Sequence, residues 1–318
     1  MQEKVEYPRY ITDTRTAKKI DLLAWKAANI RYSYILAFFV FALFIAIAYL
    51  IAIVSSPESA IFYISIALFL AIGQNIVAYW FGDDIALKVA KARPANKDEE
   101  RYLVNITEAI SFGTGLPMPK IYVMDSDLPN AFATGRNPNH SAIAVSTALL
   151  ALLDRQELEG VIAHEMSHIK NYDILFLTML AATVGALVIM RDLFMRSLRY
   201  GSRRSNKSDK GQVEAIAYLI LLILLILAPI LGTMLHLAVS RRREYLADAT
   251  AVYLTRNPDG LISALEKLAK FKDSGKEAIN DGIRHLYFVD PKAFRRQIQG
   301  VFATHPLIED RIERLKSL

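Results

Sequence analysis

Residues 163–190 read AHEMSHIKNYDILFLTMLAATVGALVIM, and this stretch decides how the rest of the chain is interpreted. It begins with two histidines, His164 and His168, four positions apart, with Glu165 directly after the first. It continues into residues 174–190, a run of 17 residues without a charge. Side chains suited to chemistry in water therefore stand beside a segment suited to the interior of a membrane.

The spacing of the two histidines favours a metal site on a helix. Side chains four apart lie one turn apart on one face, so both imidazoles can reach one metal ion. Glu165 lies next to this face, where it can take a proton from the attacking water and pass it to the leaving amine. Asp154 and Glu157 have the spacing of a capping box, and residues 161–184 contain no Pro or Gly. One long helix is therefore expected to carry the motif into the bilayer. The alternative is a pair of surface histidines beside a solvated glutamate.

A zinc hydrolase needs a third protein ligand, and no third histidine closely follows His168. The chain has no cysteine, so this ligand must be His, Asp or Glu. Glu244 is the candidate, with Asp248 one helical turn later on the same face. Glu244 would bind the metal, and Asp248 would accept the free ring N–H of a ligating histidine. A charged helix start beside the membrane is the alternative reading of RRREYLAD, residues 241–248.

Composition and patterning predict a membrane protein. Hydrophobic residues make up 53% of the chain and the mean hydropathy is +0.24, which is high for a soluble protein. Residues 33–54 and 60–81 are two charge-free runs of 22 residues, each long enough to span a bilayer as a helix. The short SSPES between them predicts a helical hairpin. The runs 174–190 and 215–239 are two further candidates.

The net charge of +6 comes mainly from two segments. Residues 1–32 carry seven Lys/Arg against four Asp/Glu, and residues 191–214 carry seven against three. Both adjoin apolar runs, so contact with anionic lipid head groups is expected. Nucleic acid is the other reading of a basic chain, but no recognition motif accompanies the charge and no nucleic-acid partner is expected. The basic tail should stay in the cytoplasm, which puts residues 82–172 there as well.

The number of membrane crossings is tied to the metal site. His168 and Glu244 must share a compartment to bind one ion, so the chain between them crosses the membrane twice or not at all. The length of the run 215–239 favours two crossings. The basic segment 191–214 favours none, because two crossings put it outside the cytoplasm. We expect two, and hence four hydrophobic helices.

Four segments resemble the HtpX-like integral-membrane zinc metallopeptidases, which are related to the type I CAAX prenyl proteases. They are GLPMPKIYVMDSDLPNAFATGRNP (115–138), ELEGVIAHEMSHIKNYD (157–173), RRREYLADATAV (241–252) and FATHPLIEDRI (302–312). The resemblance implies one Zn²⁺ bound by His164, His168 and Glu244, with Glu165 as the base. It also implies the role of Asp248 beside a ligating histidine.

The segment NAFATG, residues 130–135, resembles the edge strand that pairs with substrate backbone in this superfamily. Asn130, Ala131, Phe132 and Ala133 are therefore expected to bind an extended peptide, because an edge strand offers unpaired N–H and C=O groups. A plain loop is the alternative. The β-branched or alternating runs KIYVMD and SAIAVST predict two further strands.

In the prenyl-protease relatives, a His and an Arg with the spacing of His305 and Arg311 face the zinc. Here they would steady the oxyanion formed when water attacks the carbonyl, unless the segment is only the start of a structural helix. Four other polar residues are expected outside the ligand set. His236 is expected to be a polar contact within an apolar run, and His140 and His285 to be exposed loop residues. Asp173, nine residues after His164 and so on the far side of a continuous helix, is expected to mark the membrane entrance.

The expected fold is a mainly α integral membrane protein, with four hydrophobic helices and a cytoplasmic zincin-like α+β catalytic domain that has a small edge-strand sheet. The ranges are a tail 1–32, a hairpin 33–81, a catalytic part 82–172, a second helix pair 173–239 and a catalytic part 240–318. The expected activity is zinc-dependent endoproteolysis of misfolded or damaged proteins in the cell membrane, near the cytoplasmic face. Prenyl-protein processing and a non-catalytic zinc-binding scaffold are the alternatives.

Overall fold

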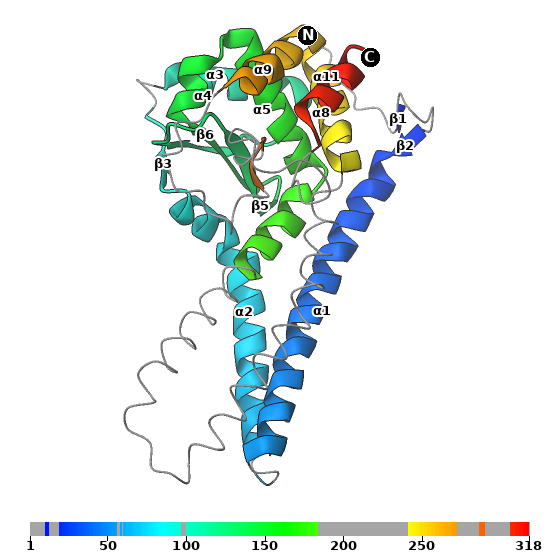
Figure 1. Ribbon diagram of the computed structural model, residues 1–318, viewed down its shortest axis with the longest axis vertical. Helices are drawn as coiled ribbons and strands as arrows, with labels where there is room; N and C mark the ends of the chain where they lie inside the picture. Colours follow the sequence, from blue (N-terminus) through cyan, green and yellow to red (C-terminus); the bar gives the residue numbers. More distant parts are fainter. Residues whose placement is uncertain are drawn as a thin grey trace.

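The computed structural model describes residues 10–12, 19–55, 58, 60–96, 100–183, 241–271, 286–289 and 306–317. Its two longest helices, α1 (Leu22–Ser55) and α2 (Ala60–Val89), form a stalk beneath a head that contains the other elements (Figure 1). The strands are β1 (Tyr10–Thr12), β2 (Lys19–Asp21), β3 (Ala92–Pro94), β4 (Lys120–Met124), β5 (Ala131–Asn137) and β6 (His140–Ser146). The remaining labelled helices are α3 (Arg101–Thr114), α4 (Thr147–Leu152), α5 (Arg155–Lys170), α8 (Arg241–Thr255), α9 (Pro258–Lys270) and α11 (Ile308–Leu315).

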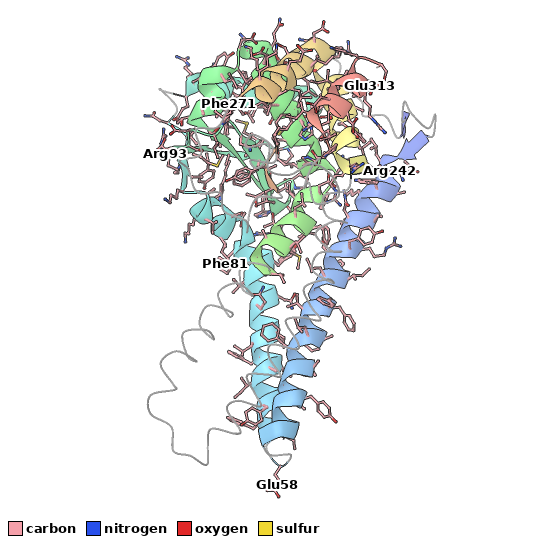
Figure 2. The ribbon with its side chains drawn as sticks, viewed as in Figure 1. Glu58, Phe81, Arg93, Arg242, Phe271 and Glu313 are labelled. Atoms are coloured by element: carbon pink, nitrogen blue, oxygen red, sulfur yellow. The ribbon has the colours of Figure 1, made fainter. Side chains whose placement is uncertain are left out.

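The stalk is the helical hairpin that the sequence predicts, with Glu58 at the tip farthest from the head (Figure 2). Both helices are long and apolar enough to cross a membrane. The buried side chains of α2 in the stalk include the small residues Ala67, Ala71 and Ala78, which let helices approach closely. Large apolar side chains point outward instead, and Ile61 and Phe69 are 80% and 78% exposed. Such an exposed apolar surface suits lipid rather than water.

The other two expected hydrophobic helices are described only in part. An apolar helix runs from Asp173 to Thr183. Residues 184–190 of the same run, and the whole run 215–239, lie outside the described residues. The structure therefore describes two of the four expected helices at membrane-spanning length.

The head contains a four-stranded mixed sheet in the order β3-β4-β6-β5. The predicted strands KIYVMD and SAIAVST correspond to β4 and β6, which pair in parallel. Residues 131–135 of the segment NAFATG lie in β5, and Asn130 directly precedes it; β5 pairs antiparallel with β6 and forms an edge of the sheet. At the end of β5, Gly135 has a φ of 136°, and a Cβ there would meet the backbone oxygen of His140 at 2.3 Å. Glycine is thus required for the tight return into β6.

The head core is centred on α5, whose residues from Leu158 to Ile169 are all buried apart from one. α5 contacts β5, α3, α8 and α9, so elements from both sides of the gap 184–240 pack around it. Gly160 permits the crossing with α9, since a Cβ at this position would lie 2.9 Å from the backbone nitrogen of Leu261. The described segments before and after residues 184–240 therefore belong to the same packed body.

The expectation of one continuous helix through the motif into the bilayer is wrong. α5 ends at Lys170, and Tyr172 has a φ of 58°, in the left-handed region that L-residues seldom adopt. A separate helix then begins at Asp173 and runs toward the stalk (Figure 1). The chain turns without Pro or Gly because groups of the head and of α1 bind the turn, as described below.

Candidate metal centre

The structure brings His164, His168 and Glu244 together inside the head. α5 supplies the histidines and begins with the expected capping box, in which Asp154 accepts from the backbone N–H of Glu157. α8 supplies Glu244. The Nε2 atoms of the two histidines lie 3.1 Å apart, and carboxylate oxygens of Glu244 lie 3.5 Å and 3.8 Å from them. In a tetrahedral zinc site with bonds of about 2.0–2.1 Å, ligand atoms lie about 3.3 Å apart, so the three residues fit such an ion.

Both imidazoles are turned so that Nδ1 faces a carboxylate and Nε2 faces the other ligands. The Nδ1–H of His164 donates to Asp248 at 2.9 Å, and the Nδ1–H of His168 donates to Asp173 at 2.8 Å. A carboxylate beside Nδ1 keeps the proton on that nitrogen and leaves the Nε2 lone pair for a metal. Two lone pairs that face each other at 3.1 Å repel, unless a cation or proton lies between them.

The electrostatics of the centre also favour a cation. Burial lowers the pKa of His164, but the hydrogen bonds with Asp248 and Glu244 outweigh this and raise the pKa to about 9. Burial raises the pKa of the Asp248 carboxyl, but Arg311 and His164 together hold it below its ordinary value. The carboxylates around the imidazoles thus stabilise a positive charge, which a divalent ion provides.

Glu165 lies beside the cluster and is only 1% exposed. Neither of its carboxylate oxygens has a hydrogen bond of ordinary length among the described residues, although the backbone N–H of Ala133 lies close enough to lower its pKa. Burial is the larger influence and raises this pKa overall. A buried carboxylate with so few partners is unfavourable, and its position beside the cluster makes Glu165 a candidate functional group.

Of the four residues expected to bind substrate, Ala133 is the one whose backbone faces the cluster. Residues two apart on a strand direct their N–H and C=O groups to the same side. Ala131 C=O accepts from the backbone N–H of Phe288 at 2.8 Å, and Gly135 N–H donates to Thr178 at 3.1 Å. Ala133 lies between them and turns its backbone toward Glu165.

Asn130 and Phe132 have structural contacts instead. Asn130 is buried, and its side-chain amide donates to the backbone oxygen of Val289 at 2.7 Å. The Phe132 ring lies edge-on to Tyr287, with their centroids 5.7 Å apart. The segment 286–289 therefore covers the first part of the β5 edge.

Arg311 is fully buried and lies on the Nδ1 side of His164, away from the ligand atoms. Its guanidinium donates to both oxygens of Asp248 at 2.9 Å and 2.7 Å, and to the backbone oxygen of Phe288 at 3.0 Å. This differs from the expected contact with the oxyanion, because the donors of Arg311 are directed at a carboxylate behind the ligand. His305, His236 and His285 lie outside the described residues. His140 is exposed as expected, but it is the first residue of β6 and not a loop residue.

The structure corrects the expected position of Asp173. A continuous helix would put it on the far side from His164, but the turn at Tyr172 brings it back to His168. Two residues that the sequence analysis did not single out complete this side. Asn29 of α1 and Arg243 of α8 both contact Asp173, at 2.6 Å and 3.1 Å. Both residues are far from Asp173 in the sequence, so no local sequence pattern indicated these contacts.

The family profile and the curated relatives indicate one family. The profile of peptidase family M48 matches residues 97–318. The protease HtpX homolog of Dictyoglomus thermophilum is 46% identical over 92% of this chain and 93% of its own length. Those of Thermoanaerobacter pseudethanolicus and Listeria monocytogenes are 44% and 41% identical, over 80% and 89% of this chain and 83% and 95% of their own lengths. Among solved structures, Ste24p of S. mikatae matches 92% of this chain and 67% of its own, with a TM-score of 0.45 and 20% identity.

Proposed function

The chain belongs to peptidase family M48 and is a membrane metalloprotease of a zinc-dependent family, and we propose that it cleaves membrane proteins, misfolded or damaged ones among them, at extended segments near the cytoplasmic face. The observation that carries this proposal is the contact between the candidate metal centre and α1. Asn29 touches Asp173, the partner of His168, and lies four residues before the charge-free run 33–54. Four helical residues span about 6 Å, so the centre lies close to the membrane boundary.

Each residue of the candidate centre has a separate role in the proposed hydrolysis. His164, His168 and Glu244 would hold Zn²⁺, which when bound would acidify water and polarise the peptide carbonyl. Glu165 takes the proton of the attacking water and delivers it to the amide nitrogen as the bond breaks. Its raised pKa suits a group that both accepts and releases a proton. The mechanism needs no covalent bond between enzyme and substrate.

Ala133 aligns the substrate. Its backbone is directed toward Glu165 from the edge strand β5, so an extended peptide that pairs there passes beside the base. Main-chain pairing recognises no particular side chain, which suits a protease for unfolded segments. The segment 286–289 and Thr178 occupy the neighbouring edge groups, so a longer substrate segment has to displace one of them.

Aromatic residues support a membrane boundary at the junction of head and stalk. Trp80 and Phe81 of α2 are exposed, and Phe81 lies just below the head (Figure 2). The guanidinium of Arg136 lies 4.4 Å from the Trp80 ring. An exposed Trp beside an Arg is typical of the membrane–water interface.

The head is proposed to face the cytoplasm of a multi-pass protein of the cell membrane. β1 contacts α8, so this part of the N-terminal segment lies at the same end of the stalk as the head. Its excess of Lys and Arg favours the cytoplasmic side, where anionic lipids attract it. In the cysteine-free chain, Glu58→Cys should react with an impermeant reagent added outside cells, and Lys120→Cys only after permeabilisation. The reverse pattern would invert the orientation.

Activity is tested with the full chain in lipid vesicles. One substrate is an unfolded polypeptide tethered to a membrane helix, and the other is the same polypeptide in solution at equal concentration. Tethered substrate should be cleaved faster, and equal rates would reject the membrane-proximity proposal. Glu165→Gln should retain zinc and lose cleavage by about 100-fold or more, whereas Glu159→Gln on the same helix should change neither. Undiminished cleavage by Glu165→Gln would reject its role as the base.

A further inference from the structure

We propose that the membrane helix α1 is a working part of the metal centre, because Asn29 of α1 positions Asp173 and Asp173 positions His168. Asn29 and Asp173 are therefore positioning residues for the reaction, and neither touches the substrate. The inference rests on the metal site proposed above. It adds one requirement beyond the metal ligands themselves: α1 must be packed against the head.

The first link is between Asp173 and His168. Asp173 is 1% exposed, and its Oδ2 accepts the Nδ1–H of His168 at 2.8 Å. The left-handed turn at Tyr172 brings the two residues together, even though such a turn is unfavourable for a bulky residue. A backbone outlier beside a ligand, retained by its surroundings, is typical of a functional site.

The second link joins Asp173 to α1. Its other oxygen, Oδ1, accepts from the Asn29 amide at 2.6 Å and from the Trp25 indole N–H at 3.4 Å. Both donors belong to α1, one turn apart. The third neighbour is Arg243 of α8, whose Nε lies 3.1 Å from the same oxygen and which directly precedes the ligand Glu244. A buried carboxylate needs such donors to remain charged.

The third link is the orientation of the Asn29 amide itself. This side chain is 2% exposed, and both of its ends are bound. Its nitrogen donates to Asp173 and, at 3.0 Å, to the backbone oxygen of Asn171, which belongs to the turn. Its oxygen accepts from Arg243 at 3.2 Å. A single amide from the membrane helix thus binds the turn, the carboxylate and the residue beside the third ligand.

This arrangement makes metal binding sensitive to the position of α1 relative to the head. A shift of α1 away from the head removes two donors from Asp173 and the acceptor from Arg243. The carboxylate then loses its fixed position, and the His168 imidazole loses the partner that sets its tautomer and orientation. Loss of such an outer partner weakens metal binding by about 10–100-fold in other metal sites.

The test measures zinc affinity of the full-length protein in lipid vesicles by competition with a chelating dye. Asp173→Asn should weaken binding by about 10–100-fold, and Asn29→Leu should weaken it by a smaller factor in the same direction. Asn29→Asp keeps the shape and the acceptor for Arg243 but turns a carboxylate toward Asp173, so it should weaken binding as well. Cobalt(II) absorption of each variant reports the ligand geometry without reference to activity, and it should change in all three.

The control is Ser33→Ala, one turn further along α1, where the buried hydroxyl donates to the Asn29 backbone oxygen and has no contact with Asp173. It should leave zinc affinity and the cobalt spectrum unchanged. If both Asn29 variants behave like Ser33→Ala, the inference is overturned. A separate variant, His168→Ala, tests the metal site itself. If His168→Ala does not weaken zinc binding, the proposed site fails, and the result is distinguishable from failure of the α1 link.

Discussion

The two histidines of the candidate centre have matching partners but different supports. Each Nδ1 faces an aspartate, and each aspartate faces an arginine: His164 with Asp248 and Arg311, and His168 with Asp173 and Arg243. The His164 half is built within the head, from α5, α8 and α11. The His168 half also needs α1, through Asn29 and Trp25. One half therefore depends on the fold of the head, and the other also depends on how the head sits on the membrane stalk.

The largest effect is expected when the head half loses Arg311. Arg311→Met leaves the buried Asp248 carboxylate without its ion-pair partner, and breaking such a pair costs about 3–5 kcal/mol. The thermal midpoint of the head and the zinc affinity should both fall. Lys316→Met, directly after the same helix, is the control, because its ion pair with Glu266 is exposed and contributes little. An Arg311→Met protein as stable as Lys316→Met would show that the His164 half has other support.

A double-mutant cycle then compares the two halves directly. Asn29→Leu combined with Asp173→Asn should be non-additive in zinc affinity, with a coupling of about 0.5–3 kcal/mol, because the two side chains are in contact. Asn29→Leu combined with Asp248→Asn should be additive within about 0.5 kcal/mol, since no described contact joins those two residues. Equal coupling in both cycles would mean that α1 acts on the whole centre rather than on one half.

A smaller effect is expected where the stalk meets the helix Asp173–Thr183. A Cβ at Gly82 of α2 would lie 2.8 Å from the side chain of Thr178, so Gly82→Ala forces this side chain, whose hydroxyl bonds with Thr134 and Gly135, to move. Overpacking of this kind costs about 1–3 kcal/mol. The midpoint of thermal unfolding should fall, whereas Gly73→Ala on the same helix meets nothing within 4 Å and should not lower it. If both variants lower it equally, the loss reflects α2 itself and not this contact.

The smallest effect is expected from Trp25→Phe. The substitution removes the indole N–H that donates to Asp173 over 3.4 Å, a long hydrogen bond, and keeps a ring for Arg242, 5.6 Å away. Zinc affinity, measured by the same chelator competition, should weaken by less than about threefold. A loss as large as that of Asp173→Asn would make Trp25, and not Asn29, the main link to α1.

Much of the molecule could be predicted from local patterns in the sequence. The capping box at Asp154 sets the start of α5, and charge-free runs of 22 residues mark the stalk helices. The four-residue spacing of His164 and His168 puts both imidazoles on one helix face, and the same spacing pairs Glu244 with Asp248. Capping residues, charge-free runs and helical spacing are all properties of short stretches of sequence.

Contacts between distant segments could not be predicted in this way. A helix continued through Tyr172 would put Asp173 on the side opposite His164. The backbone is left-handed at Tyr172, so the helix ends there and Asp173 lies beside His168 instead. Arg311 was expected at the oxyanion because of its spacing from His305, yet its guanidinium binds Asp248. The cover that residues 286–289 form over the β5 edge joins segments more than 150 residues apart. Nothing local in either segment marks the other as its partner.

The sequence by itself determined the residue types of the centre and the periodic elements that carry them, since hydropathy and helical spacing are properties of neighbouring residues. Tertiary structure alone decided which groups stand behind the ligands. Asp173, Asn29 and Arg243 meet because a left-handed turn, a membrane helix and a returning helix converge on one buried carboxylate. A buried charge is stable only where donors surround it, and packing of the whole chain determines where those donors are.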